Sequence, residues 1–129
     1  MLLMLTLIAA TAAGRPDEAM GRVSSVTDGA NFNVDGFGPV RLAGVSVPAI
    51  GTTDGVHSRE FALENILNVQ VFLDIDDNIS SGYGPTPCVV YLYSPGGPDL
   101  RRNFNKMVIE AGYGTLNKEA GSEFDPSKW

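Results

Sequence analysis

GRVSSVTDGANFNVDGFGPVRLAGVSVP, at residues 21–48, consists of short apolar and polar pieces separated by Asp-Gly dipeptides. Alternating apolar and polar residues are typical of strands with one solvated face, and Asp-Gly is typical of tight turns because glycine tolerates positive φ. A central strand cannot easily continue through proline, so the run should end at Pro48. The stretch predicts strands over residues 22–26, 32–34 and 40–45, with turns at Asp28-Gly29 and Asp35-Gly36.

Two helices are expected in the rest of the chain. The first covers residues 56–67, and its N-cap is Thr52, Thr53 or Asp54. The second follows a cap at Asn103 and ends at Gly112, a residue type common just after a helix. Its buried face should hold Phe104, Met107, Val108 and Ala111, which are spaced three and four residues apart.

Two more strands are predicted, at residues 69–74 and 88–93. Gly, Ser and Pro make residues 78–87 a loop and residues 94–99 a turn. Pro126 should prevent a helix in the C-terminal tail. The order of three strands, a helix, two strands and a helix predicts a small, closed or partly open five-stranded β-barrel.

The composition agrees with one small domain of this kind. The chain has 129 residues, 15 glycines, eight prolines and a formal charge of −6. Many turns in so short a chain favour short strands over a helical bundle. We expect an apolar, signal-like segment at residues 1–13, a linker at 14–20, the barrel domain at 21–116 and a tail at 117–129.

Residues 1–13 read MLLMLTLIAATAA, an uncharged run shorter than the roughly 20 apolar residues needed to span a bilayer. Ala10 and Ala12 form a small-x-small pattern, so cleavage near Ala12–Ala13 is expected, although no Lys or Arg precedes the run. This predicts a secreted or cell-surface protein without a stable membrane span. A buried first strand or a mobile tail is the alternative.

Five groups of residues follow one another along the chain. They are Val26-Thr-Asp28-Gly29, Val40-Arg-Leu-Ala-Gly-Val45 with Pro48, Tyr83-Gly84, Val90-Tyr-Leu-Tyr93 and Asn105-Lys-Met-Val108 with Ala111-Gly112-Tyr113. In this order and spacing the chain resembles the staphylococcal-nuclease-like (thermonuclease) domain, from about Gly21 to Thr115. The resemblance implies an α+β, mainly β fold, a five-stranded OB-fold barrel with two or three helices. It also implies calcium-dependent hydrolysis of phosphodiester bonds, which requires oxygen ligands for the ion, a carboxylate base and arginines on the phosphate.

Most of these chemical groups are missing at the matching positions. One calcium-ligating Asp of the family is replaced by Ala30 and another by Ser46. The base-like Glu is replaced by Ala49 and the second phosphate-binding Arg by Pro85. Arg41, the first such Arg, is retained as the one candidate catalytic residue, and Asp28 is retained in a supporting position. We therefore expect no metal ligands, no bound calcium or other cofactor, and no nuclease activity.

Three functions remain as hypotheses. The first is a catalytically silent, exported nuclease-like domain that acts as a binding or interaction module, with an unknown partner. The second is an active calcium-dependent endonuclease whose metal site has moved to Asp28, Asp35 or the acidic residues 74–77. The third is a module that binds oligonucleotides or oligosaccharides, although an isoelectric point near 4.5 disfavours nucleic acid because phosphate contacts need cations.

Other candidates have ordinary explanations. Arg41 could hold a phosphate or pair with a nearby acid. The acids Asp74, Asp76 and Asp77 are expected at a solvated strand end, His57 has no visible acid-base partner, and Cys88 should be a core residue. Arg101, Arg102 and Lys106 form the only basic cluster and should lie on a solvated helix face. The tyrosines that could stack on bases or serve the core are Tyr83, Tyr91, Tyr93 and Tyr113.

Overall fold

The computed structural model describes residues 15–79 and 82–129, so the signal-like segment predicted at 1–13 lies outside the described residues. The main strands are β1 (Ala19–Asp28), β2 (Asn31–Val34), β3 (Gly38–Leu42), β5 (Gln70–Ile75), β6 (Thr86–Ser94) and β7 (Gly97–Asn103). Two short strands, β4 (Val45–Ser46) and β8 (Thr115–Leu116), form a separate pair. The helices are α1 (Thr53–Ile66), α2 (Phe104–Glu110) and the short 3-10 helix η1 (Pro126–Lys128).

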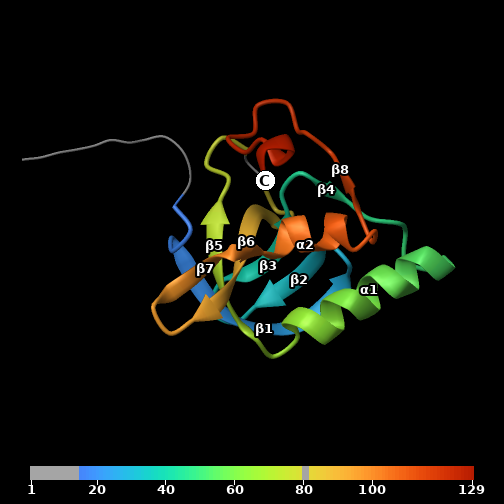
Figure 1. The fold of residues 1–129 in the computed structure, drawn as a ribbon, viewed down its shortest axis with the longest axis horizontal. Helices are drawn as coiled ribbons and strands as arrows, with labels where there is room; N and C mark the ends of the chain where they lie inside the picture. The colour runs from blue at the N-terminus through green and yellow to red at the C-terminus, as the bar shows by residue number, and fades with distance from the viewer. Residues whose placement is uncertain (1–14, 80–81) are drawn as a thin grey trace, which may run out of the picture.

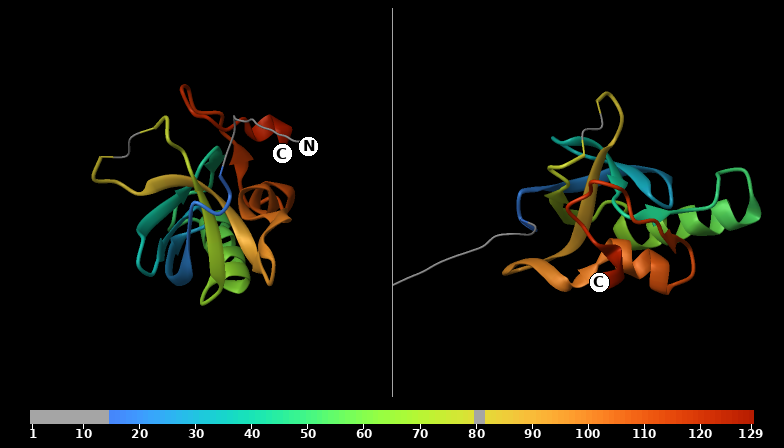
Figure 2. Two further views of the ribbon diagram at one scale, coloured as in Figure 1. Left: turned by 90° about the vertical axis from the view of Figure 1, so that its left-hand side faces the viewer. Right: turned by 90° about the horizontal axis from the view of Figure 1, so that it is seen from above.

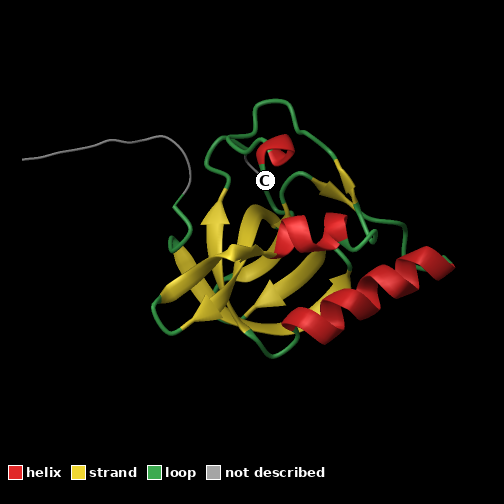
Figure 3. Ribbon diagram, viewed as in Figure 1, coloured by secondary structure: helices red, strands yellow, loops and turns green. Residues whose placement is uncertain are grey.

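Five strands close into a barrel (Figures 1 and 3). Neighbouring strands pair in the order β3-β2-β1-β5-β6, all antiparallel. A parallel pairing of β3 with β6, which sets Val40 opposite Thr86 and Leu42 opposite Cys88, closes the ring. This confirms the predicted α+β fold with an OB-like barrel, and closure leaves the barrel strands few free edges.

The barrel interior is filled by alternate residues of its strands. Each helix adds a few side chains to this core, with α1 packed against β1 and α2 against β6 and β7. The fully or almost fully buried apolar residues include Val23, Phe32, Val34, Val40, Leu42, Val71, Leu73, Val90 and Leu92 from the barrel and Ala62, Ile66, Phe104 and Val108 from the helices.

The helix ends follow the predicted signals. Thr52 is the N-cap of α1 and accepts a hydrogen bond from the Gly55 amide at 3.0 Å, so the helix begins at Thr53, earlier than expected. Asn103 caps α2 by accepting from the Lys106 amide at 3.1 Å. Gly112 follows α2 with φ of 83°, as expected for a residue just after a helix. Of the predicted α2 face, Ala111 is exposed.

Three predicted boundaries differ from the structure. The expected turn at 94–99 is shorter, because β7 already begins at Gly97 and pairs Pro98 with Tyr93. The expected strand at 40–45 breaks at Gly44, whose φ of 74° takes the backbone out of the strand before β4. The expected linker at 14–20 is partly strand, because β1 starts at Ala19 and pairs there with Leu73.

The roles predicted for Pro126 and Gly29 were also wrong. Pro126 does not prevent a helix but begins η1, where a missing amide hydrogen costs nothing. Gly29 is not among the described glycines with positive φ. Its role is close packing, because a Cβ there would lie 1.8 Å from the Ser58 hydroxyl oxygen of α1. Only glycine lets the β1–β2 turn approach the helix this closely.

Candidate functional site

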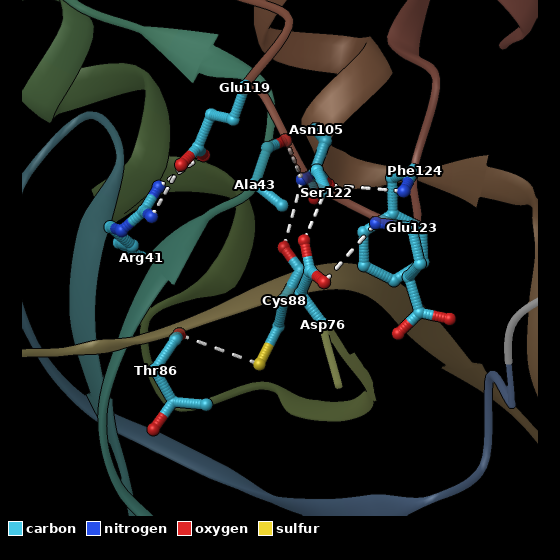
Figure 4. Close-up of polar contacts among 10 residues, drawn as sticks. All are labelled: Arg41, Ala43, Asp76, Thr86, Cys88, Asn105, Glu119, Ser122, Glu123 and Phe124. Atoms are coloured by element: carbon cyan, nitrogen blue, oxygen red, sulfur yellow. Dashed lines mark hydrogen bonds and ion pairs between the residues drawn. The ribbon is translucent and has the colours of Figure 1, made fainter. Parts of the chain in front are cut away.

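Arg41, the retained candidate, lies on β3 opposite Asn31 of β2 and Pro87 of β6. Its guanidinium donates two hydrogen bonds to Glu119, at 2.6 Å to Oε1 and 2.8 Å to Oε2 (Figure 4). The side chains keep 30% and 21% of their surfaces exposed, so the pair is partly shielded from water. The bonds to Glu119 raise the pKa of Arg41, and the same bonds lower the pKa of Glu119. Of the two explanations left open, the structure shows the arginine paired with an acid.

Asp28 supports the β1–β2 turn. Its Oδ1 accepts from the Ala30 amide at 2.8 Å and from Asn31 Nδ2 at 3.0 Å, and Oδ2 accepts from the same Nδ2 at 3.1 Å. Ala30 is buried, and its carbonyl accepts from the Leu42 amide next to Arg41. The turn and Arg41 therefore share one rim of the barrel, where the methyl group of Ala30 offers no ligand to a cation.

Ser46 and Ala49 lie beyond Gly44. Ser46 is exposed on β4 and lines a groove of about 260 Å³ together with Pro48, Tyr113 and Thr115. Ala49 is exposed, and its carbonyl accepts from the Thr52 hydroxyl at 2.6 Å, so it supports the start of α1. A serine hydroxyl and a methyl group at these positions can neither ligate a hard cation strongly nor take a proton from water.

Pro85 precedes β6, two residues before the partner of Arg41 on that strand. Tyr83, in the same loop, is fully exposed. Pro85 has no side-chain donor, so this loop cannot supply the second cation that a phosphate would need. The structure therefore brings Asp28, Ala30 and Arg41 to one rim without a second positive group from these predicted positions.

The acidic residues at the end of β5 correct a prediction, because two of them are not solvated. Asp74 and Asp76 are only 3% and 2% exposed. Asp76 accepts hydrogen bonds from the Ser122 hydroxyl and from the Glu123 amide at 3.3 Å (Figure 4). It also accepts from the Asn78 amide at 3.0 Å. The carboxylate therefore anchors the C-terminal segment. In residues 15–79 and 82–129, no three His, Cys, Asp or Glu side chains are grouped so that they could hold a metal ion.

Asp74 is the one buried side chain, among those described, that has a polar atom without a partner, at Oδ1. Burial, together with the nearby carboxylates of Glu123, Glu18 and Asp77, raises the pKa of Asp74 to about 6, against an opposing hydrogen bond from the Arg15 amide. A carboxyl group in this position takes up a proton well above the usual pH for aspartate.

Neither His57 nor Cys88 is placed to act in nucleophilic catalysis. His57 is exposed in the second turn of α1, and the neighbouring Ser58 hydroxyl donates to the Tyr113 carbonyl at 3.0 Å. Cys88 is fully buried, and desolvation raises its thiol pKa to about 12. A thiol in this state is a core side chain and a poor nucleophile, in agreement with the sequence interpretation.

The arginines of the basic cluster are exposed to solvent, whereas two of the tyrosines pack against other aromatic rings. Arg101 and Arg102 are exposed on β7, not on a helix as predicted, and Arg101 lies 3.6 Å from Asp99. Tyr93 stacks on Phe72 with ring centres 6.2 Å apart, and Tyr113 packs on Phe61 at 5.0 Å. These two rings therefore already have aromatic partners within the domain.

Sequence reasoning assigned no structural role to three polar residues that organise this end of the barrel. Glu119 and Ser122 make their contacts across 78 and 46 residues of sequence, so no local pattern announces them. Asn105 is fully buried, and its amide donates to the Ala43 and Cys88 carbonyls (Figure 4). Its side-chain oxygen accepts from the Val90 amide. An asparagine in the first turn of an otherwise apolar helix face was the available signal.

A scan against models of known protein families gives no match for this chain, and a search of curated proteins gives none either. In the part of the chain that the structure describes, no helix is long and apolar enough to cross a membrane.

Proposed function

We propose that this chain is a staphylococcal-nuclease-like barrel that has lost hydrolytic activity and acts as an exported binding or interaction module. The observation that carries the proposal is the state of Arg41. The one cation retained at the predicted site is engaged by Glu119 of the same chain through two short hydrogen bonds. A phosphate at this position would have to displace that carboxylate.

The side chains at the other predicted positions support the same proposal. Phosphodiester hydrolysis needs a cation or arginines on the phosphate and a group that takes a proton from water. Ala30, Ser46, Ala49 and Pro85 supply none of these. Loss of a general base costs about 10²–10⁴ in rate and loss of one charge-stabilising donor about 10²–10³. The effects are not additive, but together they leave little rate enhancement.

The expectation of export has a separate basis, the uncharged apolar run at residues 1–13. A chain with a formal charge of −6 favours a partner other than a polyanion. A protein or carbohydrate partner is more consistent with this charge than nucleic acid.

The test is a cleavage assay on single-stranded DNA and on RNA, with and without calcium. We expect no calcium-dependent cleavage above a no-protein control and no difference between the unmodified chain and Arg41→Ala. Calcium-dependent cleavage that disappears in Arg41→Ala would overturn the proposal. Thermal unfolding of both proteins shows whether the variant is folded.

A further inference from the structure

Residues 117–129, here called the strap, follow β8 and pass the end of β5 before they return towards α2 (Figures 1 and 2). The strap begins with a hydrogen bond from the Asn117 amide to the Gly44 carbonyl at 2.8 Å. Its end packs on the same glycine, because a Cβ at Gly44 would lie 2.9 Å from Pro126 and 3.3 Å from Trp129.

Between these ends the barrel contacts a series of polar groups that follow one another along the strap. Arg41 holds the Glu119 carboxylate. Three residues further along, Asp76 accepts from the Ser122 hydroxyl and then from the Glu123 amide. The Asp77 amide donates to the Glu123 carboxylate at 2.7 Å. The barrel surface thus contacts a carboxylate, a hydroxyl, a backbone amide and a second carboxylate along one segment.

Apolar burial holds the end of the strap, where Pro126 is buried and Trp129 packs against the core, but not its middle. Asn117, Lys118, Ala120 and Gly121 are exposed, and Pro126 is its one buried residue. Segments with few buried apolar contacts and partly exposed polar contacts open at a lower free energy than the core. The middle of the strap, residues 118–123, should therefore separate from the barrel at a lower free energy than the core unfolds.

We infer that the surface under the strap is a peptide-binding site, and that the strap is its occupant within the chain. The partner is a protein with an extended acidic segment of the pattern Glu-x-x-Ser-Glu, which takes the place of residues 119–123. Arg41 reads the first carboxylate, Asp76 the hydroxyl and amide, and the Asp77 amide the last carboxylate. This inference rests on the proposed function as an interaction module and names its partner class.

A tethered strap competes with such a partner at a local concentration in the millimolar range, so the unmodified chain binds the partner weakly. Changes that weaken the strap but leave the barrel surface intact should increase binding. Glu119→Gln and Ser122→Ala meet this requirement, because both residues belong to the strap. Arg41→Gln removes a group of the barrel surface and should decrease binding.

The test measures fluorescence anisotropy of a labelled peptide with the sequence of residues 116–129, LNKEAGSEFDPSKW, added to the full chain. The double variant Glu119→Gln/Ser122→Ala should bind the peptide at least tenfold more tightly than the unmodified chain. Adding Arg41→Gln to the double variant should reverse most of this gain. A peptide with both glutamates replaced by glutamine is the matched control and should bind at least tenfold less tightly.

Equal binding of both peptides, or no gain in the double variant, would overturn the inference. Thermal unfolding of each variant identifies one that has not folded, and the single variant Glu119→Gln then gives the same comparison with a smaller change. The readout is independent of nuclease activity. Cleavage by the unmodified chain would contradict the proposed function, whereas failure of the peptide to bind would contradict only the peptide site.

Discussion

Arg41 and Glu119 form a two-bond ion pair, at 2.6 and 2.8 Å, between β3 and the strap. The two residues are 78 positions apart, so the pair fixes the C-terminal segment on the barrel rim. Because both carboxylate oxygens accept from the guanidinium, the geometry is stronger than that of an ordinary surface pair.

The pair should therefore show measurable coupling. In a double-mutant cycle with Arg41→Gln and Glu119→Gln, we expect a coupling free energy of about 1 kcal/mol, discounted for partial exposure. Chemical denaturation of the four proteins gives this value. The more exposed pair of Lys118 and Asp125, 3.7 Å apart, is the control and should show coupling near zero. Equal coupling in the two pairs would contradict a special role for Arg41.

Asp74 should make stability depend on pH. Its folded pKa of about 6 exceeds its ordinary value of 3.8, so the folded chain binds this proton more tightly than the unfolded chain. The resulting stabilisation is complete below 3.8 and is lost as the pH rises through 6.

Asp74→Asn should therefore raise the free energy of unfolding at neutral pH by about 1–3 kcal/mol and change it little in acid. Denaturation at several pH values measures the difference. Asp17→Asn, at an exposed carboxylate, is the matched control and should have a small effect at every pH. A variant that is less stable than the unmodified chain at neutral pH would contradict this account of Asp74.

Asn105 should be one of the most sensitive positions in the domain. Alanine there leaves the Val90 amide and the Ala43 carbonyl without this partner in the core. We expect a loss of about 2–4 kcal/mol in unfolding free energy. Asn33→Ala removes an exposed bond to Ser25 and should cost less than about 0.5 kcal/mol. Similar losses in both variants would show that burial of Asn105 is not the cause.

Gly29 should tolerate no side chain. A methyl group would overlap the Ser58 side chain, so Gly29→Ala should separate the β1–β2 turn from α1 and cost about 1–3 kcal/mol. Gly96→Ala is the control, because nothing lies within 4 Å of a Cβ there and its φ is not positive. A melting temperature equally affected by both changes would refute the packing explanation.

Local signals in the sequence were sufficient for much of the fold. Thr52, Asn103 and Gly112 mark helix ends by rules that involve only neighbouring residues, and apolar alternation located the barrel strands. These signals fail where tertiary pairing decides the structure. The strand β7 forms at a Gly-Pro sequence because the edge of β6 that faces away from β5 supplies backbone hydrogen-bonding partners.

The candidate site was only partly predictable for the same reason. The sequence singled out Arg41 and the side chains missing around it, but it could not reveal that Glu119 occupies the guanidinium. Nor could it reveal that Asp76 is buried, because the groups that cover it come from the strap, 46 residues later in the chain. Acidic residues at a strand end normally face water, and here the strap replaces that water with an amide and a hydroxyl.

The proposed loss of hydrolytic activity depends most on the absence of a calcium-binding site at the rim formed by the β1–β2 turn, Arg41 and β4. The most direct measurement is a calcium titration followed by amide NMR shifts, residue by residue. We expect no saturable shifts at residues 28–31 or 45–49 up to millimolar calcium. Saturable shifts at both segments at micromolar calcium would place an ion on this rim and contradict the account.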